Sequence, residues 1–253
     1  MKSFFLTIFT LFTSLWMLQA QTASPEAIKA YNAKQYGKAA QILQQEVDSQ
    51  KKKGYESAGL YYNLGNAYFR SNELAKAILY YERALSLDPG NKDIRHNIAY
   101  ANTRIEDKIV KAENFFIADW FDSIENIFSS NAWAKLAIIL FLATITGCFF
   151  FLFGRQIWIK KTAFYVTIIG VVLVVLFNIF AYNQKSEINN KNQAIVMVPE
   201  LNVMNAPSET SKQVFNLHAG TKITINKTDG DWFEIEIENG NVGWIKSDKI
   251  EII

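Results

Sequence analysis

The sequence predicts a multidomain membrane protein that combines all-α helical hairpins, a two-span transmembrane helix hairpin and a small all-β barrel. Three observations support this fold class. Apolar residues recur at helical spacing in the first part of the chain, two long apolar runs follow, and apolar and polar residues alternate from residue 194 onward. A chain of 253 residues has room for roughly two or three small domains.

The composition excludes several classes of function. The formal net charge of +2 is too small to indicate a nucleic-acid-binding protein, and no basic run is interleaved with aromatic residues. The single cysteine, Cys148, lies in an apolar run, so we expect neither an internal disulfide nor a Cys/His metal site. Ser/His/Asp sets, Cys/His sets and phosphate-binding loops are missing from the sequence. We therefore expect a protein that is not an enzyme and needs no cofactor.

The first residues have the pattern of an export signal. Lys2 precedes an uncharged run from Phe4 to Leu18, and small residues up to Ala20 offer a cleavage site. At about 1.5 Å per residue, this run is shorter than the ~30 Å hydrocarbon core of a bilayer. The pattern favours a secretory signal over an uncleaved anchor, and whether the segment is removed stays open.

Two later apolar runs have the length of membrane spans. The first extends from Leu136 to Gly154 and the second from Thr162 to Gln184, and neither contains an ionisable group. The turn between them carries Arg155, Lys160 and Lys161, and basic residues favour the cytoplasmic side. Together with the export signal, this charge pattern predicts a protein of the cytoplasmic (inner) membrane with both soluble parts on the periplasmic side.

Between residues 61 and 90, small, aromatic and aliphatic residues recur in two runs with helical spacing. Asn72 lies at the break between the runs, and Pro89 ends the second. Glycine or alanine at the closest contacts lets the two helix backbones approach each other. The repeating positions are Tyr61, Leu64, Gly65 and Tyr68 in the first run and Ala77, Tyr81 and Ala84 in the second.

These spacings, together with Pro89, resemble the tetratricopeptide signature, although Asn72 replaces the usual glycine. A weaker copy with Tyr36, Ala39 and Leu43 precedes the clear one, and a last helix follows over residues 93–104. Roughly two repeats and a capping helix are fewer than the about three repeats that bury a continuous core. We therefore expect another part of the protein to cover an open face.

The tetratricopeptide resemblance implies that the first helices of the repeats bind an extended peptide or a partner's helix. Asn66 stands where peptide-binding members hold the backbone of a ligand. Two alternatives are that Tyr62 and Phe69 pack against the preceding helix, and that His96 is only a surface residue. The implied partner-binding residues are Tyr62, Asn66, Phe69, Arg70, His96, Asn97, Tyr100 and Arg104.

The segment from 108 to 132 predicts an amphipathic juxtamembrane helix. Two interpretations stay open, because this helix either lies on the outer leaflet or caps the open end of the repeats. Its acidic face argues against recognition of anionic lipid. The apolar face holds Ile117, Trp120, Phe121, Ile124 and Phe128, and the polar face holds Asp119, Asp122 and Glu125.

After the second span, alternation of apolar and polar residues predicts short strands. Ile223 and Ile225 alternate with polar residues, as do Phe233, Ile235 and Ile237, and a strong hairpin turn follows at residues 239–240. The sequence therefore predicts a small barrel of five or six strands.

The stretches LNVMNAPS, LHAGT, DGDWFEI and NGNVGWIKSDKI resemble, in this order, the bacterial Src-homology-3-like domain, with Met204 at a usual arginine position. Members of that family bind cell-wall peptides or short protein segments. The resemblance therefore implies Trp232 and Trp244 as candidates for binding wall or peptide. The alternative for Trp244 is that it fills the floor of the barrel, and His218 is interpreted as a surface side chain.

The order of the parts resembles the tetratricopeptide proteins of the Bat family, from the Bacteroides-type aerotolerance operon. This resemblance implies partners among Bat-type membrane proteins with von Willebrand factor type A domains, and indirectly a MoxR-type ATPase. We expect a non-enzymatic membrane scaffold, plausible in aerotolerance or envelope stress, that also contacts membrane lipid. The alternative is a cell-wall sensor or tether that binds peptidoglycan through its barrel.

The expected division of the chain follows from these patterns. It comprises a signal peptide (1–20), a tetratricopeptide repeat domain (21–107), an amphipathic juxtamembrane segment (108–132), a transmembrane helix (133–154), a cytoplasmic loop (155–161), a second transmembrane helix (162–184), a linker (185–193) and a bacterial Src-homology-3-like domain (194–253).

Overall fold

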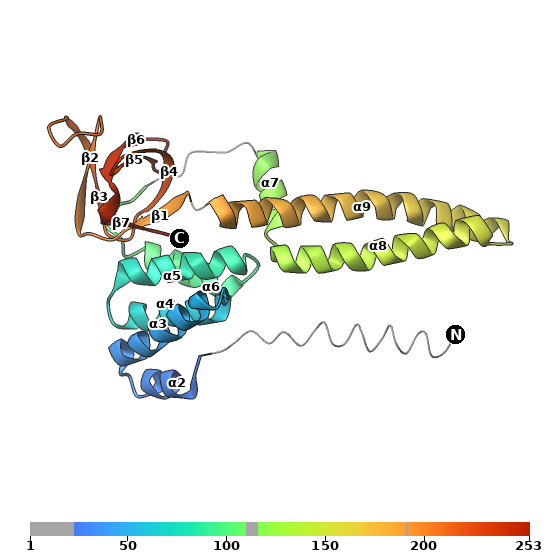
Figure 1. The fold of residues 1–253 in the computed structure, drawn as a ribbon, viewed down its shortest axis with the longest axis horizontal. Helices are drawn as coiled ribbons and strands as arrows, with labels where there is room; N and C mark the ends of the chain where they lie inside the picture. The colour runs from blue at the N-terminus through green and yellow to red at the C-terminus, as the bar shows by residue number, and fades with distance from the viewer. Residues whose placement is uncertain (1–22, 110–115, 191) are drawn as a thin grey trace.

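The computed structural model describes residues 23–109, 116–190 and 192–253, and the expected signal peptide lies outside them. The described parts form a helical domain, a long helix hairpin and an antiparallel sheet (Figure 1). The helical domain and the sheet both lie at one end of the hairpin (Figure 1). This architecture confirms the predicted fold class.

The helical domain contains α2 (Pro25–Asn32), α3 (Tyr36–Lys52), α4 (Ala58–Arg70), α5 (Leu74–Leu87) and α6 (Lys92–Asn102). Helices that are consecutive in the chain pack against each other as hairpins.

Local signals explain where these helices begin and turn. The hydroxyl of Ser57 accepts a hydrogen bond from the backbone N–H of Leu60 at the start of α4, at 3.3 Å, and the side chain of Asn91 caps α6 in the same way. Asn72 adopts a left-handed backbone with φ of 66° between α4 and α5. Asparagine tolerates this conformation better than most residues, so the turn forms without the usual glycine.

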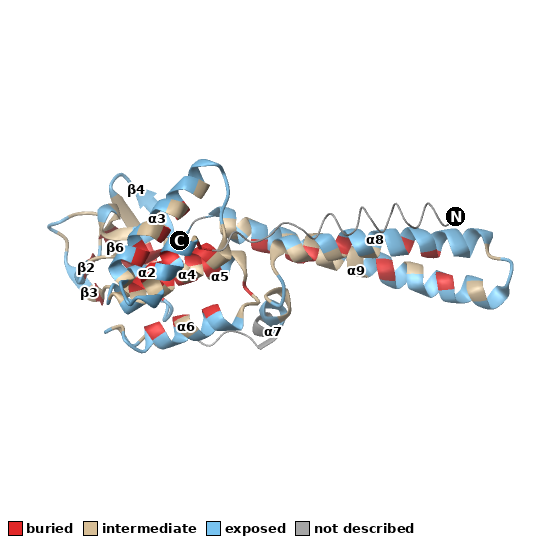
Figure 2. Cartoon of the chain, turned by 90° about the horizontal axis from the view of Figure 1, so that it is seen from below, coloured by how far each residue is buried: buried red, intermediate tan, exposed pale blue. Residues whose placement is uncertain are grey.

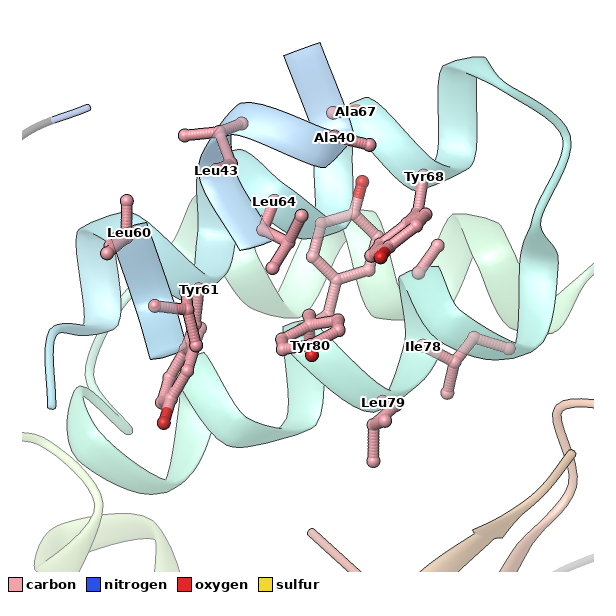
Figure 3. Packing of buried hydrophobic residues seen from close by; sticks show 14 of the residues in the cluster. Ala40, Leu43, Leu60, Tyr61, Leu64, Ala67, Tyr68, Ile78, Leu79 and Tyr80 are labelled. Atoms are coloured by element: carbon pink, nitrogen blue, oxygen red, sulfur yellow. The ribbon is translucent and has the colours of Figure 1, made fainter. Parts of the chain in front are cut away.

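The contact between α4 and α5 depends on a glycine. A Cβ atom placed on Gly65 would lie 2.6 Å from Cδ1 of Tyr81, so only glycine allows this approach. Side chains of α3, α4 and α5 fill the space between the helices, among them Leu43, Leu64 and Tyr80 (Figure 3). The predicted packing of small residues against aromatic residues thus forms the core of this domain.

The hairpin consists of α8 (Ser130–Phe153) and α9 (Ile157–Asn190). Both helices are long and apolar enough to cross a membrane, and only 11% and 17% of their most apolar windows are buried. Their outer faces are exposed along the whole length (Figure 2). The two helices approach closely at small residues, because a Cβ on Gly147 would lie 2.9 Å from Oγ1 of Thr167.

The expected linker over residues 185–193 differs from the structure. Helix α9 continues to Asn190, and the first strand already begins at Gln193. The segment after the second apolar run contains no glycine or proline, so its polar character does not end the helix. The side-chain amide of Gln184 also donates to the carbonyls of Glu125 and Phe128, at 2.6 and 2.9 Å. These bonds hold this part of α9 against the end of α7 (Phe116–Glu125).

The described C-terminal residues form a seven-stranded antiparallel sheet, where five or six strands were expected. Strands β1 and β7 pair at one edge, and β1 begins at the last residue of the expected linker. These strands are too short to show clear alternation. The strands are β1 (Gln193–Val196), β2 (Glu200–Met204), β3 (Gln213–His218), β4 (Lys222–Asp229), β5 (Trp232–Glu236), β6 (Val242–Lys246) and β7 (Ile250–Ile252), in the spatial order β3-β2-β6-β5-β4-β1-β7.

The sheet domain packs against α5, where it covers the open face of the repeats. Ile195 of β1 is 0% exposed and belongs to the core of the helical domain, against which Met197 and Ile253 also pack. Gly220, with φ of 95°, lies so close to this domain that a Cβ atom would come within 2.8 Å of Ile105. A few residues of the sheet domain therefore belong to the core of the helical domain, while the rest of the sheet keeps a separate core of its own.

Candidate functional site

The first helices of the repeats bring several of the expected binding residues together. The hydroxyl of Tyr81 and the amide of Asn97 both donate to Oδ1 of Asn66, at 2.8 and 2.9 Å. The Asn97 amide also donates to the hydroxyl of Tyr62, at 3.2 Å. Asn66 is therefore engaged inside the protein, where these bonds connect α4, α5 and α6.

A second group lies beside this network and combines arginines with aromatic rings. The guanidinium of Arg70 donates to the hydroxyl of Tyr36 at 2.9 Å and lies 5.0 Å from the centre of its ring. The guanidinium of Arg104 lies 4.8 Å from the ring of Phe69 and 5.0 Å from the ring of Tyr100. We call Tyr36, Phe69, Arg70, Tyr100 and Arg104 the aromatic–arginine surface.

The aromatic–arginine surface is accessible and positively charged. Arg70, Tyr100 and Arg104 are exposed, and neither arginine forms an ion pair with a carboxylate of the described residues. His96 is exposed one helical turn before Tyr100 on the same side of α6. Tyr36 was not among the expected binding residues, since it belongs to the second helix of the weaker repeat and only the fold brings it to Arg70.

A cluster that the sequence did not indicate joins the two soluble domains. The carboxylate of Asp107 accepts hydrogen bonds from the backbone N–H of His218 at 2.7 Å, from the hydroxyl of Thr221 at 2.5 Å, and pairs with Nδ1 of His218 at 2.7 Å. We call these three residues the interdomain clasp. His218 is thus paired rather than a free surface side chain, and Nε2 of its ring lies 3.6 Å from Glu106.

The clasp shifts the pKa values of both ionisable members. The hydrogen bond to Asp107 raises the pKa of His218 above its usual 6.5. Burial alone would raise the pKa of Asp107, but the hydrogen bonds from Thr221 and His218 outweigh burial and lower it below 3.8. The Thr221 hydroxyl donates to Asp107 and not to His218, so the cluster lacks the geometry that activates a nucleophile.

Ion pairs reinforce the same domain contact. Lys222 of β4 pairs with Glu82 of α5 at 2.8 Å, and Glu82 is buried. Arg83 of α5 pairs with Glu251 at 3.0 Å and donates to the carbonyl of Ile252 at 2.5 Å. These partners lie far apart in the sequence, so no motif spacing could reveal them.

The outer face of the barrel carries the two expected tryptophans. Along β6, Gly243 and Ile245 are buried, whereas Trp244 between them is half-buried on the opposite face. Trp244 therefore does not fill the barrel floor. Trp232 of β5 lies on the same outer face, where Lys246 is 5.9 Å from the centre of its ring.

Two hollows are the other features that a ligand can use. A hollow of about 480 Å³ beside Trp232 is lined by Met204, Glu209 and Lys246 among others, and Lys246 pairs with Glu209 across it. A larger open cleft of about 1380 Å³ lies where the helical domain, the end of α9 and the barrel meet. We call it the junction cleft, and its lining carries charges of both signs, such as Arg83 and Glu187. Within the described ranges, no group of three His, Cys, Asp or Glu side chains is placed to hold a metal ion.

Comparison with known families assigns both soluble domains. No curated protein matches the chain. Residues 58–91 match the tetratricopeptide repeat, which covers α4, α5 and the turn after them. Residues 199–251 match the bacterial SH3 domain, which covers the sheet from β2 into β7. Both domain types are non-catalytic in kind and bind other molecules. The protein thus carries a tetratricopeptide repeat, which mediates contacts between proteins, and a bacterial SH3 domain, separated by two apolar helices.

Proposed function

We propose that the protein is a non-enzymatic membrane scaffold that holds a segment of a partner protein on its aromatic–arginine surface. The observation that supports this function is the state of the two arginines. Arg70 and Arg104 are held over aromatic rings and exposed, without a carboxylate partner among the described residues. A guanidinium that is already positioned loses little further freedom when it binds, which favours recognition.

The chemistry of the surface defines the partner segment. The rings of Phe69 and Tyr100 offer apolar contact, and the guanidiniums of Arg70 and Arg104 offer paired donors to carboxylates. The fitting partner is therefore an extended or helical segment with acidic and apolar side chains. His96 would lie at the edge of the bound segment.

Tyr62, Asn66 and Asn97 have a supporting role in this proposal. Their mutual hydrogen bonds hold α4 to α6, and Tyr62 packs against Tyr81 with ring centres 6.0 Å apart. The network fixes the distance between Arg70 on α4 and Arg104 beyond α6. A partner would contact only the remaining half-exposed parts of these side chains.

A co-purification experiment tests the scaffold function. Arg70→Gln combined with Arg104→Gln should abolish recovery of partner proteins from native membranes, with folding nearly unchanged because exposed cation–π contacts contribute about 0.5–1 kcal/mol each. Lys38→Gln with Lys92→Gln removes the same charge from exposed positions of the same domain and should leave recovery unchanged. Equal recovery with both double variants would refute the proposal.

We further propose that both soluble domains lie on the periplasmic side of the cytoplasmic membrane. Two features support this orientation: both domains attach to the same end of the hairpin, and Arg155, Lys160 and Lys161 lie at the other end. A reporter that is active only outside the cytoplasm should work after residue 253 and fail after Lys160. Activity at Lys160 alone would reverse the orientation.

The order of the domains supports a proposal about the partners. Other Bat-type membrane proteins with von Willebrand factor type A domains fit a scaffold of this kind, and a MoxR-type ATPase would act indirectly from the cytoplasm. In this proposal the complex serves aerotolerance or the response to envelope stress. Mass spectrometry of the co-purified proteins tests it, because the absence of such proteins from the recovered set would contradict the assignment.

A second function is favoured by the hollow beside Trp232, where this half-buried ring, Met204 and the Lys246–Glu209 pair form a small binding surface. We propose that this surface grips peptidoglycan and tethers the scaffold to the cell wall. Trp232→Ala should reduce sedimentation with purified peptidoglycan, whereas Val242→Ala on the outer face of β6 should not. If both variants sediment like the unmodified protein, the tether function is wrong.

A further inference from the structure

Helix α7 has a polar side that is turned toward the soluble domains. Asp122, Ser123 and Asn126 line the junction cleft, which lies between the helical domain and the end of α9. At 100° per residue, Phe121 and Ile124 lie on the opposite side of the helix, and Trp120 lies at the edge between the two sides. The apolar side of α7 therefore faces away from the cleft.

Among the described side chains, most of the apolar side of α7 is exposed, and Ile124 is half-buried. The exposed fraction is 59% for Trp120 and 47% for Phe121, and Ile127 and Phe128 in the following turn are exposed as well. A helix that capped the repeats would bury these side chains. The structure thus decides against the capping interpretation for the residues that it describes.

Hydrogen bonds fix the position of α7 relative to the hairpin. The indole N–H of Trp133 donates to the carbonyl of Glu125 at 2.8 Å, and Gln184 of α9 donates to the same carbonyl. The hydroxyl of Ser130 donates to the carbonyl of Ala181 at 2.8 Å, which joins the two helices of the hairpin just below. The axis of α7 runs across the hairpin rather than along it (Figure 1).

The depth of α7 follows from helix geometry. Lys135 is the last charged residue before the apolar run of α8, so it marks the edge of the hydrocarbon core. From Lys135 back to Ser130 the helix rises about 7.5 Å at 1.5 Å per residue. The headgroup layer of each leaflet is roughly 5–7.5 Å thick, so Ser130 lies at its outer edge. Trp133, whose indole holds the carbonyl of Glu125, is only two residues from Lys135 and lies within the layer. The end of α7 therefore lies at the level of the lipid headgroups.

We propose that α7 is an interfacial helix that inserts its apolar side into the membrane leaflet next to the soluble domains. The occupant of the exposed face is lipid, because the face continues the apolar surface of the hairpin at the depth of the headgroups. The acidic residues Asp122 and Glu125 give this helix no attraction to anionic lipid, so neutral lipid suffices. Arg95 of α6 donates to the carbonyl of Asn126 at 3.1 Å, and through this bond the inserted helix holds the repeat domain at the membrane surface.

Site-directed spin labels on the full chain in nanodiscs of neutral phosphatidylcholine test the proposal. In a Cys148→Ser background, labels at Phe121→Cys and Asp122→Cys report the two sides of α7. Labels at Phe149→Cys on the hairpin and Asp231→Cys on a barrel loop set the values for lipid and for water. Collisions with oxygen, which dissolves in lipid, should dominate at Phe121, and collisions with a water-soluble nickel complex should dominate at Asp122.

The outcomes separate lipid from other occupants. Nickel access at Phe121 as high as at Asp231 would overturn the proposal, because it would place this side chain in water. Low nickel access would indicate lipid, since purified protein in nanodiscs has no other partner to cover this face. Equal values at Phe121 and Asp122 would also overturn it, since an inserted amphipathic helix must distinguish its two sides. A shift toward lipid contact only after addition of phosphatidylglycerol would contradict the neutral-lipid part.

Discussion

Removal of the Asp107 carboxylate tests whether the interdomain clasp holds the barrel on the repeats. In Asp107→Ala, the backbone N–H of His218 and the hydroxyl of Thr221 both lose their acceptor. Thr221 is 1% exposed, so water cannot replace the carboxylate at its hydroxyl unless the domains separate. The contact between the domains should therefore weaken, while each domain keeps its own core.

The magnitude follows from the number of groups left without a partner. Each buried donor that loses its acceptor costs about 1–3 kcal/mol. His218 is only half-buried, so water partly replaces the bonds that its backbone N–H and its ring Nδ1 lose. We therefore expect a loss of about 2–4 kcal/mol in the docking free energy, which is a change of roughly 30- to 1000-fold in the docking equilibrium.

Hydrogen exchange with mass spectrometry measures this change in the full chain in nanodiscs. In Asp107→Ala, exchange should rise for α5 and for the turn around Gly220, which the docked domains cover together. Glu106→Ala is the matched control, because Glu106 lies next to Asp107 but is 74% exposed and reaches only Nε2 of His218. Such an exposed ion pair contributes about 0–1 kcal/mol. Equal exchange in both variants would show that the clasp does not hold the domains together.

Three further predictions concern the interdomain clasp and the core of the helical domain. The pKa of His218 is raised, so its stabilisation of docking is full below pH 6.5 and is lost as the pH rises through the shifted value. The pKa of Asp107 is lowered, so its contribution is lost only in acid. Protection factors of α5, which are corrected for the intrinsic pH dependence of exchange, should fall at both ends of the pH range, and protection factors that do not change with pH would contradict the assignment. Gly65→Ala should destabilise the helical domain by up to about 2 kcal/mol, because crowding of Tyr81 costs about 1–3 kcal/mol and the gain in helix propensity offsets about 1 kcal/mol. Urea unfolding in detergent measures this change, and a variant more stable than the unmodified protein would contradict the close contact at Gly65. Ile195→Ala should cost about 2–5 kcal/mol and raise exchange in α5, although the residue belongs to the barrel. Unchanged exchange in α5 would disprove the role of Ile195 in the core of the helical domain.

Local sequence patterns were sufficient for most of the fold. Helix spacing around Gly65 and Tyr81, and alternation around Ile235, are set by neighbours a few residues apart. The continuation of α9 to Asn190 and the strand β1 around Ile195 were missed. Their stability comes from tertiary contacts, namely the bonds of Gln184 and the core of the other domain, which no local window contains.

The sequence likewise indicated part of the candidate site, and only the structure shows the rest. The tetratricopeptide resemblance implied Arg70 and Arg104 as binding residues of the first helices. The structure places Arg70 at the end of α4 and Arg104 just beyond α6, and it adds the aromatic rings that position them. The same resemblance assigned Asn66 to a ligand, but its acceptor atom is used by Tyr81 and Asn97. The clasp between Asp107 and His218 was unpredictable from spacing, because its members come from separate domains.

Docking of the barrel connects the two soluble domains twice, once through the helix hairpin and once through their direct contact. The chain leaves the repeat domain through α7, crosses the hairpin, returns through α9 and is clamped back onto α5. Domains that are joined only by a linker can rotate independently, but domains that are joined at two places must move together. A force that a partner applies to the repeats would therefore be divided between both helices of the hairpin, and a tilt of the hairpin would reorient the repeats and the barrel together. Opening of the interdomain clasp would remove the direct contact, and the barrel could then move independently of the repeat domain.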